Sequence, residues 1–231
     1  MSRGFSLEGL GEDAVLLRFG DAIDSAINAC VHATAQRIGE QRPTWLLDIV
    51  PAFATLALCV DAQALPAETS ALDAVAGWLA DLDLSVTANA TPGAARCHEI
   101  AVRYGGEDGP DLDAVAAHAG LDAAEVIRRH AATRYRVGML GFAAGFPYLI
   151  GMDPALAMAR HATPRTRVAA GSVGIGGAQT GIYPQAGPGG WQIIGRTEAQ
   201  LFDASRPMPA LLQPGDELRF VAVDLRDSEA S

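Results

Sequence analysis

The chain has 231 residues, which is enough for one large domain or two small ones. Its hydrophobic residues (49%) and charged residues (19%) match a globular protein, and its net charge of −10 argues against nucleic-acid binding, which needs a broad basic surface. The longest apolar stretches, such as residues 52–60, are about half as long as the roughly 20 residues of a membrane span, and no signal peptide is recognisable, so we expect a soluble, cytoplasmic protein.

Three residue types narrow the possible chemistry further. The sequence contains no Lys, which excludes a P-loop lysine, Schiff-base chemistry and a biotin-carrying lysine. Cys30, Cys59 and Cys97 are odd in number and show no CxxC spacing, so we expect them to be reduced. The five His residues show no HxH or HExxH spacing, and no metal site is predicted.

The N-terminal part alternates short apolar runs with helical patterns. Strands are predicted at residues 15–19, 45–50 and 55–60, where apolar residues are bounded by Gly, Pro and Asp. Apolar residues recur at helical spacing over 23–38 and 72–82. This order predicts a small α/β plait of the βαββαβ type.

A linker is predicted near residue 92. The stretch 88–96 holds Thr, Pro, Gly and Ala residues and little of larger size, as in connections between domains. We therefore expect two domains, at residues 1–92 and 93–231.

The second domain is expected to open with a strand over 98–104 and two short helices. Asp111 can cap the first helix and Gly120 can end it, while Asp122 and Glu125 resemble a capping box for the second.

Beyond residue 132 helical periodicity disappears. The stretch 138–195 holds 13 of the 25 Gly residues, between short β-prone pieces at 173–175 and 191–194, and a last strand is predicted at 217–223. Many strands joined by tight turns are typical of a closed β-barrel. The predicted fold class is therefore α+β, a small plait followed by a barrel.

Positive charge is concentrated in the barrel half. Residues 128–196 contain eight Arg and one acid, Asp153, for a local sum of +7. Guanidinium groups bind carboxylates and phosphates in a bidentate manner, so one explanation is an anionic ligand. The other is that these Arg pair with carboxylates of the N-terminal domain or of a partner. For Arg165 and Arg167, which follow the rigid Pro164, we favour contact with the ligand.

Three glycine-rich segments, 141–148, 171–181 and 187–191, can bring backbone amides close to a ligand, although most of their glycines are expected at barrel corners and bulges. His130 lies at a helix end beside Arg128 and Arg129, where it either interacts with the helix terminus or acts as an acid or base. It is the one catalytic candidate. The candidate substrate-binding residues are Arg165, Arg167, Gln179, Thr180, Tyr148, Gly189, Gly190 and Trp191.

Four motifs of the barrel half resemble the carboxyltransferase C/D-subdomain family, which includes the B subunit of 5-oxoprolinase, sporulation-kinase inhibitors and part of urea carboxylase. They are GFAAGFPYL at 141–149, ATPRTR at 162–167, QTGIYP at 179–184 and GGWQIIGRT at 189–197. The likeness continues through YGGE at 104–107 and covers nearly the whole chain. Four long motifs in the same order make this resemblance specific.

The resemblance implies that the barrel is cyclophilin-like and that the chain acts as the B subunit of an ATP-dependent 5-oxoprolinase. In that scheme a related C subunit docks on it directly, a separate A subunit is the third member of the enzyme, and ATP is used to cleave 5-oxoproline to glutamate. The B and C subunits would activate the lactam carbonyl by phosphorylation, and this chain alone would be inactive. The alternatives are a regulator that inhibits a sporulation-type histidine kinase and a subunit of urea or allophanate metabolism.

Overall fold

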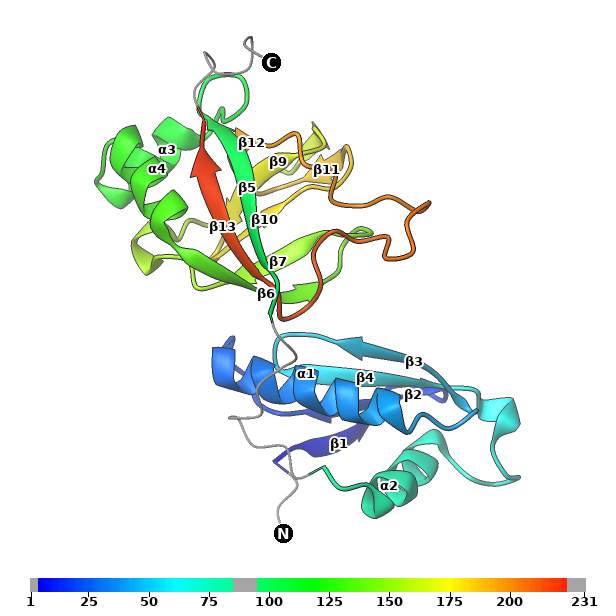
Figure 1. Ribbon diagram of the computed structural model, residues 1–231. Helices are drawn as coiled ribbons and strands as arrows, with labels where there is room; N and C mark the ends of the chain where they lie inside the picture. Colours follow the sequence, from blue (N-terminus) through cyan, green and yellow to red (C-terminus); the bar gives the residue numbers. More distant parts are fainter. Residues whose placement is uncertain (1–3, 85–94, 224–231) are drawn as a thin grey trace. The chain divides into compact units, whose positions relative to one another are not determined.

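The computed structural model describes residues 4–84 and 95–223. The chain divides into two compact units, Met1–Ala94 and Ala95–Ser231 (Figure 1). The boundary expected between residues 92 and 93 lies in 85–94, outside the described residues. No helix in the described ranges is long and apolar enough to cross a membrane.

Residues 4–84 of the N-terminal unit form one antiparallel sheet and two helices. Its elements are β1 (Ser6–Gly9), β2 (Ala14–Arg18), α1 (Ser25–Glu40), β3 (Leu46–Pro51), β4 (Thr55–Val60), the 3-10 turn η1 (Ala62–Ala64) and α2 (Ala71–Asp81). The strand order is β1-β2-β4-β3. The predicted strands and helices of this half are all present, but their βαββαβ order is not confirmed. An additional strand, β1, comes first, and no strand follows α2 among the described residues up to 84.

Alternating burial builds the core of this unit. Along β4, Leu56, Leu58 and Val60 are buried while the residues between them are partly exposed. Val31 and Ile38 of α1 belong to the same buried cluster, seven residues apart and therefore on one helical face. Apolar residues that alternate along the strands and apolar residues at helical spacing thus pack together in one hydrophobic cluster.

The second unit is a closed barrel of seven strands with two helices, which confirms the barrel predicted for this half. Its strands are β5 (Cys97–Tyr104), β6 (Arg134–Leu140), β7 (Pro147–Ile150), β9 (Ser172–Gly176), β10 (Gln179–Ile182), β12 (Gln192–Arg196) and β13 (Glu217–Ala222). They close in the order β10-β7-β6-β13-β5-β12-β9, with β13 and β5 parallel and the other pairs antiparallel. The elements outside the barrel are α3 (Leu112–Ala119), α4 (Ala123–Ala132), the turn η2 (Pro154–Leu156) and a two-stranded sheet of β8 (Arg165–Val168) and β11 (Gly187–Gly189).

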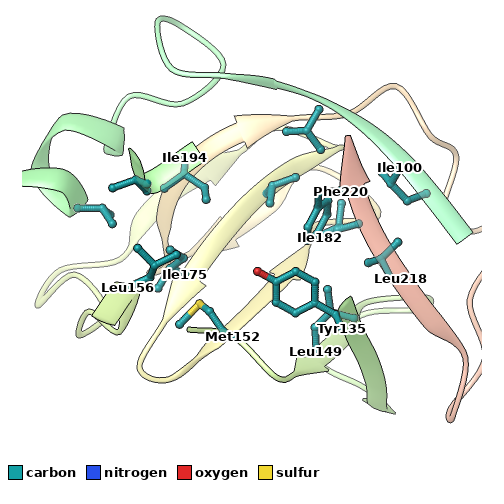
Figure 2. Packing of buried hydrophobic residues seen from close by; sticks show 14 of the residues in the cluster. Ile100, Tyr135, Leu149, Met152, Leu156, Ile175, Ile182, Ile194, Leu218 and Phe220 are labelled. Atoms are coloured by element: carbon teal, nitrogen blue, oxygen red, sulfur yellow. The ribbon is translucent and has the colours of Figure 1, made fainter. Parts of the chain in front are cut away.

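Each barrel strand contributes a buried side chain to the interior (Figure 2). Seen in strand order, these are Ile100, Tyr135, Leu149, Ile175, Ile182, Ile194 and Phe220. Met152 and Leu156, which follow β7, belong to the same cluster. The barrel is therefore filled by side chains, and a ligand site has to lie outside this core.

The helix ends of this unit follow local rules with one exception. Gly120 ends α3 in the left-handed conformation (φ 67°), and the Asp122 side chain accepts from the N–H of Glu125 at 2.7 Å at the start of α4. Asp111 stands at the N-cap of α3, but its side chain makes no capping hydrogen bond. The prediction that Asp111 caps this helix is therefore wrong, because its carboxylate bonds to residues far along the chain.

Candidate functional site

A pocket of about 310 Å³ lies in the barrel unit, and all four motifs of the sequence contribute to its walls. Five of its eleven lining residues are aromatic. The lining residues are Phe142, Phe146, Tyr148, Arg160, His161, Pro164, Tyr183, Pro188, Gly189, Gly190 and Trp191. A mostly apolar hollow with a few polar and cationic groups is the usual form of a small-molecule site.

Buried aromatic rings form the floor of the pocket. Phe146 meets Tyr183 with ring centroids 5.3 Å apart and Trp191 with centroids 5.4 Å apart, both nearly perpendicular. Edge-to-face contacts of this kind hold rings in defined orientations. At the rim, Phe142 is 66% exposed and has a positive φ of 63°, a strained conformation for a residue with a large side chain.

Glycines allow these rings to lie directly on the barrel strands. A Cβ added to Gly176 would come within 2.6 to 2.7 Å of three atoms of the Trp191 indole, and one added to Gly181 within 3.0 Å of the Phe146 ring. Neither glycine needs an unusual backbone angle, so the requirement is for space. Two glycines of the segment 171–181, which we expected to approach a ligand, therefore make room for the aromatic floor instead.

Two neighbouring residues bring positive or titratable groups to the pocket. The guanidinium carbon of Arg160 lies 5.7 Å from the centre of the Trp191 ring, within the range of a cation–π contact. Burial raises the pKa of Tyr148 and of Tyr183, and the positive charge of Arg160 opposes both shifts. His161 follows directly and also lines the pocket.

Asp111 connects three elements behind the pocket. Its Oδ1 accepts from Arg165 Nη2 at 2.7 Å, and its Oδ2 accepts from the Ile193 backbone N–H at 2.6 Å and lies 3.3 Å from His161 Nε2. Burial alone would raise the pKa of Asp111, but the hydrogen bonds from Arg165, Ile193 and His161 lower it below its ordinary value. The carboxylate is therefore ionised near neutral pH and holds β8, β12 and the His161 loop together.

The predicted substrate-binding residues fall into three groups. Tyr148, Gly189, Gly190 and Trp191 line the pocket. Arg165 stands behind it, paired with Asp111, and Arg167 is exposed on β8. Gln179 and Thr180 lie on β10 outside the lining, and Gln179 Nε2 is buried without a hydrogen-bond partner in the described part of the chain. Ligand contacts by Arg165 and Arg167 stay predictions.

The basic stretch is largely explained by ion pairs within its own unit. Arg128 and Arg129 pair with Glu125, Arg134 pairs with Glu217, Arg165 with Asp111 and Arg196 with Asp108. These acids belong to the barrel unit, not to the N-terminal domain as one alternative supposed. Arg136, Arg160 and Arg167 make no ion pair with any described residue of their own unit, 95–223.

His130, the expected catalytic residue, is fully buried in the barrel core and does not line the pocket. Its Nδ1 lies 2.7 Å from the Tyr104 hydroxyl and its Nε2 lies 3.0 Å from the Thr180 hydroxyl. Thr180 donates its one hydroxyl proton to the Gly174 carbonyl at 2.9 Å, so its oxygen accepts from Nε2–H and Nδ1 accepts from Tyr104. This chain of hydrogen bonds requires one neutral tautomer of His130. A catalytic role for it stays a prediction that no pocket contact supports.

We expect His130 to make stability depend on pH. Burial lowers its pKa to about 3 from 6.5, so between these values the unfolded chain binds a proton that the folded chain does not. The free energy of unfolding should therefore fall by about 1.4 kcal/mol for each pH unit as the pH drops from 6.5 towards 3. Equilibrium denaturation of the protein and of His130→Gln at several pH values measures this slope. If the free energy of unfolding fell with the same slope for both proteins, the assignment would be contradicted. The carboxylates titrate in both proteins, so only a difference in slope reports on His130.

Sites for metal ions are not formed by the described residues. Within 4–84 and 95–223, no group of three or more His, Cys, Asp or Glu side chains is placed to hold a metal ion. Cys30, Cys59 and Cys97 form no disulfide among the described residues. The geometry of the aromatic pocket supports the binding of a small ligand.

Comparisons with known proteins agree with the resemblance of the four motifs. Over its full length the chain is 40% identical to the B subunit of 5-oxoprolinase from Bacillus subtilis (strain 168) and covers 98% of that protein. It is 41% identical over 92% of its length to the protein of the same name from Escherichia coli O157:H7, of which it covers 93%. Among solved structures, the crystal structure of TTHA0988 matches 91% of this chain with a TM-score of 0.78 and 37% identity, and the chain spans 40% of that longer protein.

The family assignment rests on the match to a family model. Residues 5–212 match the model described as the carboxyltransferase domain, subdomain C and D. This range includes all four motifs and every residue that lines the pocket. The chain therefore belongs to the carboxyltransferase subdomain C and D family.

Proposed function

We propose that this chain is the B subunit of an ATP-dependent 5-oxoprolinase, which acts with the A and C subunits to cleave 5-oxoproline to glutamate. Two relatives that bear this name match it over nearly their whole lengths. Relatives that match over nearly their whole length are a sounder basis for a functional proposal than the barrel fold, which by itself supports many activities.

The observation that carries the proposal is the convergence of the motifs. Phe146 and Tyr148 come from the first motif, Pro164 from the second, Tyr183 from the third and Trp191 from the fourth, and all of them line one pocket. We propose that this pocket receives the lactam. Its flat aromatic walls suit a small ring, and the amide group of that ring is uncharged and needs few polar partners.

The partners are proposed because the pocket lacks much of what the reaction requires. Opening a lactam with ATP needs groups that bind the nucleotide phosphates and groups that transfer protons. Among the pocket-lining residues only Arg160 and His161 carry cationic or titratable nitrogen groups. We therefore propose that ATP is used by the complex and that the C subunit docks directly on this chain to complete the site. A cytoplasmic location belongs to the same proposal.

The test is turnover with and without the partners. The purified chain should show no 5-oxoproline-dependent ATP hydrolysis, and co-expression with the A and C subunits should yield a complex that hydrolyses ATP and releases glutamate. Urea should not stimulate the complex. Full activity from the chain alone would contradict the need for partners, and stimulation by urea instead of 5-oxoproline would favour the urea alternative. An inactive complex together with a chain that inhibits a histidine kinase would favour the regulatory alternative.

A further inference from the structure

Arg160 differs from the other arginines of the basic stretch in its surroundings. Five of the eight are paired with carboxylates of the barrel unit, and three make no ion pair with a described residue of that unit. Of those three, Arg136 and Arg167 are not among the pocket-lining residues, and Arg160 is. One unpaired guanidinium therefore faces the proposed lactam site.

The position of Arg160 over Trp191 leaves its donors available. A guanidinium that lies on an aromatic face keeps its N–H groups at its edge, where they can bind a carboxylate in a bidentate manner. At 5.7 Å from the indole centre, Arg160 meets this condition. The aromatic ring restricts the side chain without neutralising its charge, which a carboxylate partner would do.

No other permanent charge among the described lining residues competes with this role. The nearby acid, Asp111, is already bonded to Arg165, His161 and the Ile193 N–H, so its negative charge is compensated behind the wall. The one permanent charge that faces a ligand is therefore the positive charge of Arg160. A single cation suits one carboxylate, whereas a triphosphate demands several cations and amides.

We propose that Arg160 binds the carboxylate of a small cyclic amide acid, and that the ring of this ligand packs against Trp191 and Phe146. With 5-oxoproline as the ligand, the inference rests on the proposed function and extends it by naming the residue that selects a lactam with a carboxylate over one without. Arg160, and not Arg165 or Arg167, is then the anion-binding arginine of the motif region.

The test compares two substitutions and two ligands. Arg160→Gln removes the charge at the pocket, and Arg134→Gln removes an exposed charge on β6 that lies outside the lining. Binding of 5-oxoproline to the complex with the A and C subunits is measured by calorimetry without ATP. Arg160→Gln should weaken it roughly ten- to a hundredfold, as expected for loss of a charged hydrogen-bonded pair, and Arg134→Gln, which loses only an exposed ion pair with Glu217, should leave it unchanged.

The second ligand, 2-pyrrolidinone, is the same ring without the carboxylate. Its affinity should be equally weak for the unsubstituted complex and for Arg160→Gln. The inference would be overturned if Arg160→Gln weakened the binding of both ligands equally, or if both substitutions had the same effect. It would also be overturned if 5-oxoproline did not bind to the unsubstituted complex. So would displacement of 5-oxoproline by ATP in direct competition. If the complex turns over 5-oxoproline normally and Arg160→Gln has no effect, the inference is wrong but the proposed function stands. If 5-oxoproline binds in an Arg160-dependent manner and no turnover follows, only the proposed reaction is wrong.

Discussion

Replacing Asp111 with Leu is expected to lower the free energy of unfolding of the barrel unit by about 3 kcal/mol. The substitution leaves Arg165 without its partner and removes the acceptor of the Ile193 N–H, while His161 loses the group that orients it. Breaking a buried ion pair destabilises by about 3 to 5 kcal/mol, and the lower value applies because the Arg165 side chain is 33% exposed. Calorimetry should show a shifted transition for the barrel unit and an unchanged one for the N-terminal unit.

A double substitution distinguishes the loss of the attraction between Asp111 and Arg165 from the cost of leaving the Arg165 charge without a partner. In Asp111→Leu combined with Arg165→Met, no unpaired guanidinium remains, and part of the lost stability should return. Asp111→Asn, which keeps an acceptor for the Ile193 N–H, should fall between the original protein and Asp111→Leu. Additive effects of the two substitutions would show that the pair does not act as a unit, and would contradict the role given to Asp111.

Substituting Ala for Gly176 is expected to reduce 5-oxoproline-dependent turnover of the complex at least tenfold. The new methyl group would lie 2.6 to 2.7 Å from three indole atoms of Trp191, so the ring has to move. Overpacking of this kind destabilises by about 1 to 3 kcal/mol. Because Trp191 forms a wall of the pocket and lies under Arg160, its displacement also moves the proposed carboxylate site.

Gly187 supplies the matched control for this substitution. It lies on β11 next to the pocket-lining Pro188, and a Cβ added there meets nothing within 4 Å. Gly187→Ala should therefore retain both stability and turnover. Turnover is measured in parallel with thermal unfolding for both variants. Equal losses in the two, or no loss in Gly176→Ala, would contradict the claim that glycine is required there for space.

The elements with one exposed and one buried face were predictable from the sequence. In β4 and β5 apolar residues alternate with others, and α1 and α2 carry apolar residues at helical spacing. The strand β9 is different, because all five of its residues are buried. Val173 and Ile175 fill the barrel, while Gly174 and Gly176 face the aromatic floor. A strand that is covered on both faces, with glycines on one face, shows no alternation of polar and apolar residues. For this part of the chain the sequence therefore predicted a barrel with many turns, but not the individual strands.

The candidate site was predictable only at the level of segments. The glycine-rich motifs contain Tyr148, Gly189, Gly190 and Trp191, which line the pocket. Asp111 has the local pattern of a helix cap, and nothing in its neighbourhood shows that it bonds to Arg165, 54 residues away. The charge count of the basic stretch did not distinguish paired from unpaired arginines, because pairing depends on which carboxylates the fold brings near.

His130 is a residue that the sequence suggested for the site and that the fold places elsewhere. Its position beside Arg128 and Arg129 at a helix end made it a candidate acid or base, yet the fold turns it into the core, where it stacks on Phe220 with ring centroids 4.6 Å apart. Whether a histidine on a short helix faces solvent or core depends on how that helix packs. Here α4 packs against β13, and this contact buries the ring.

The central claim, that the aromatic pocket receives the substrate, is tested most directly by hydrogen–deuterium exchange of the assembled complex with and without 5-oxoproline. A bound ligand slows exchange in the backbone segments that surround it. We predict slower exchange in residues 141–148, 160–167 and 183–191, which contain all the lining residues, and no change in 46–60 of the N-terminal unit. Unchanged exchange in all three segments at a 5-oxoproline concentration that saturates turnover would contradict the account.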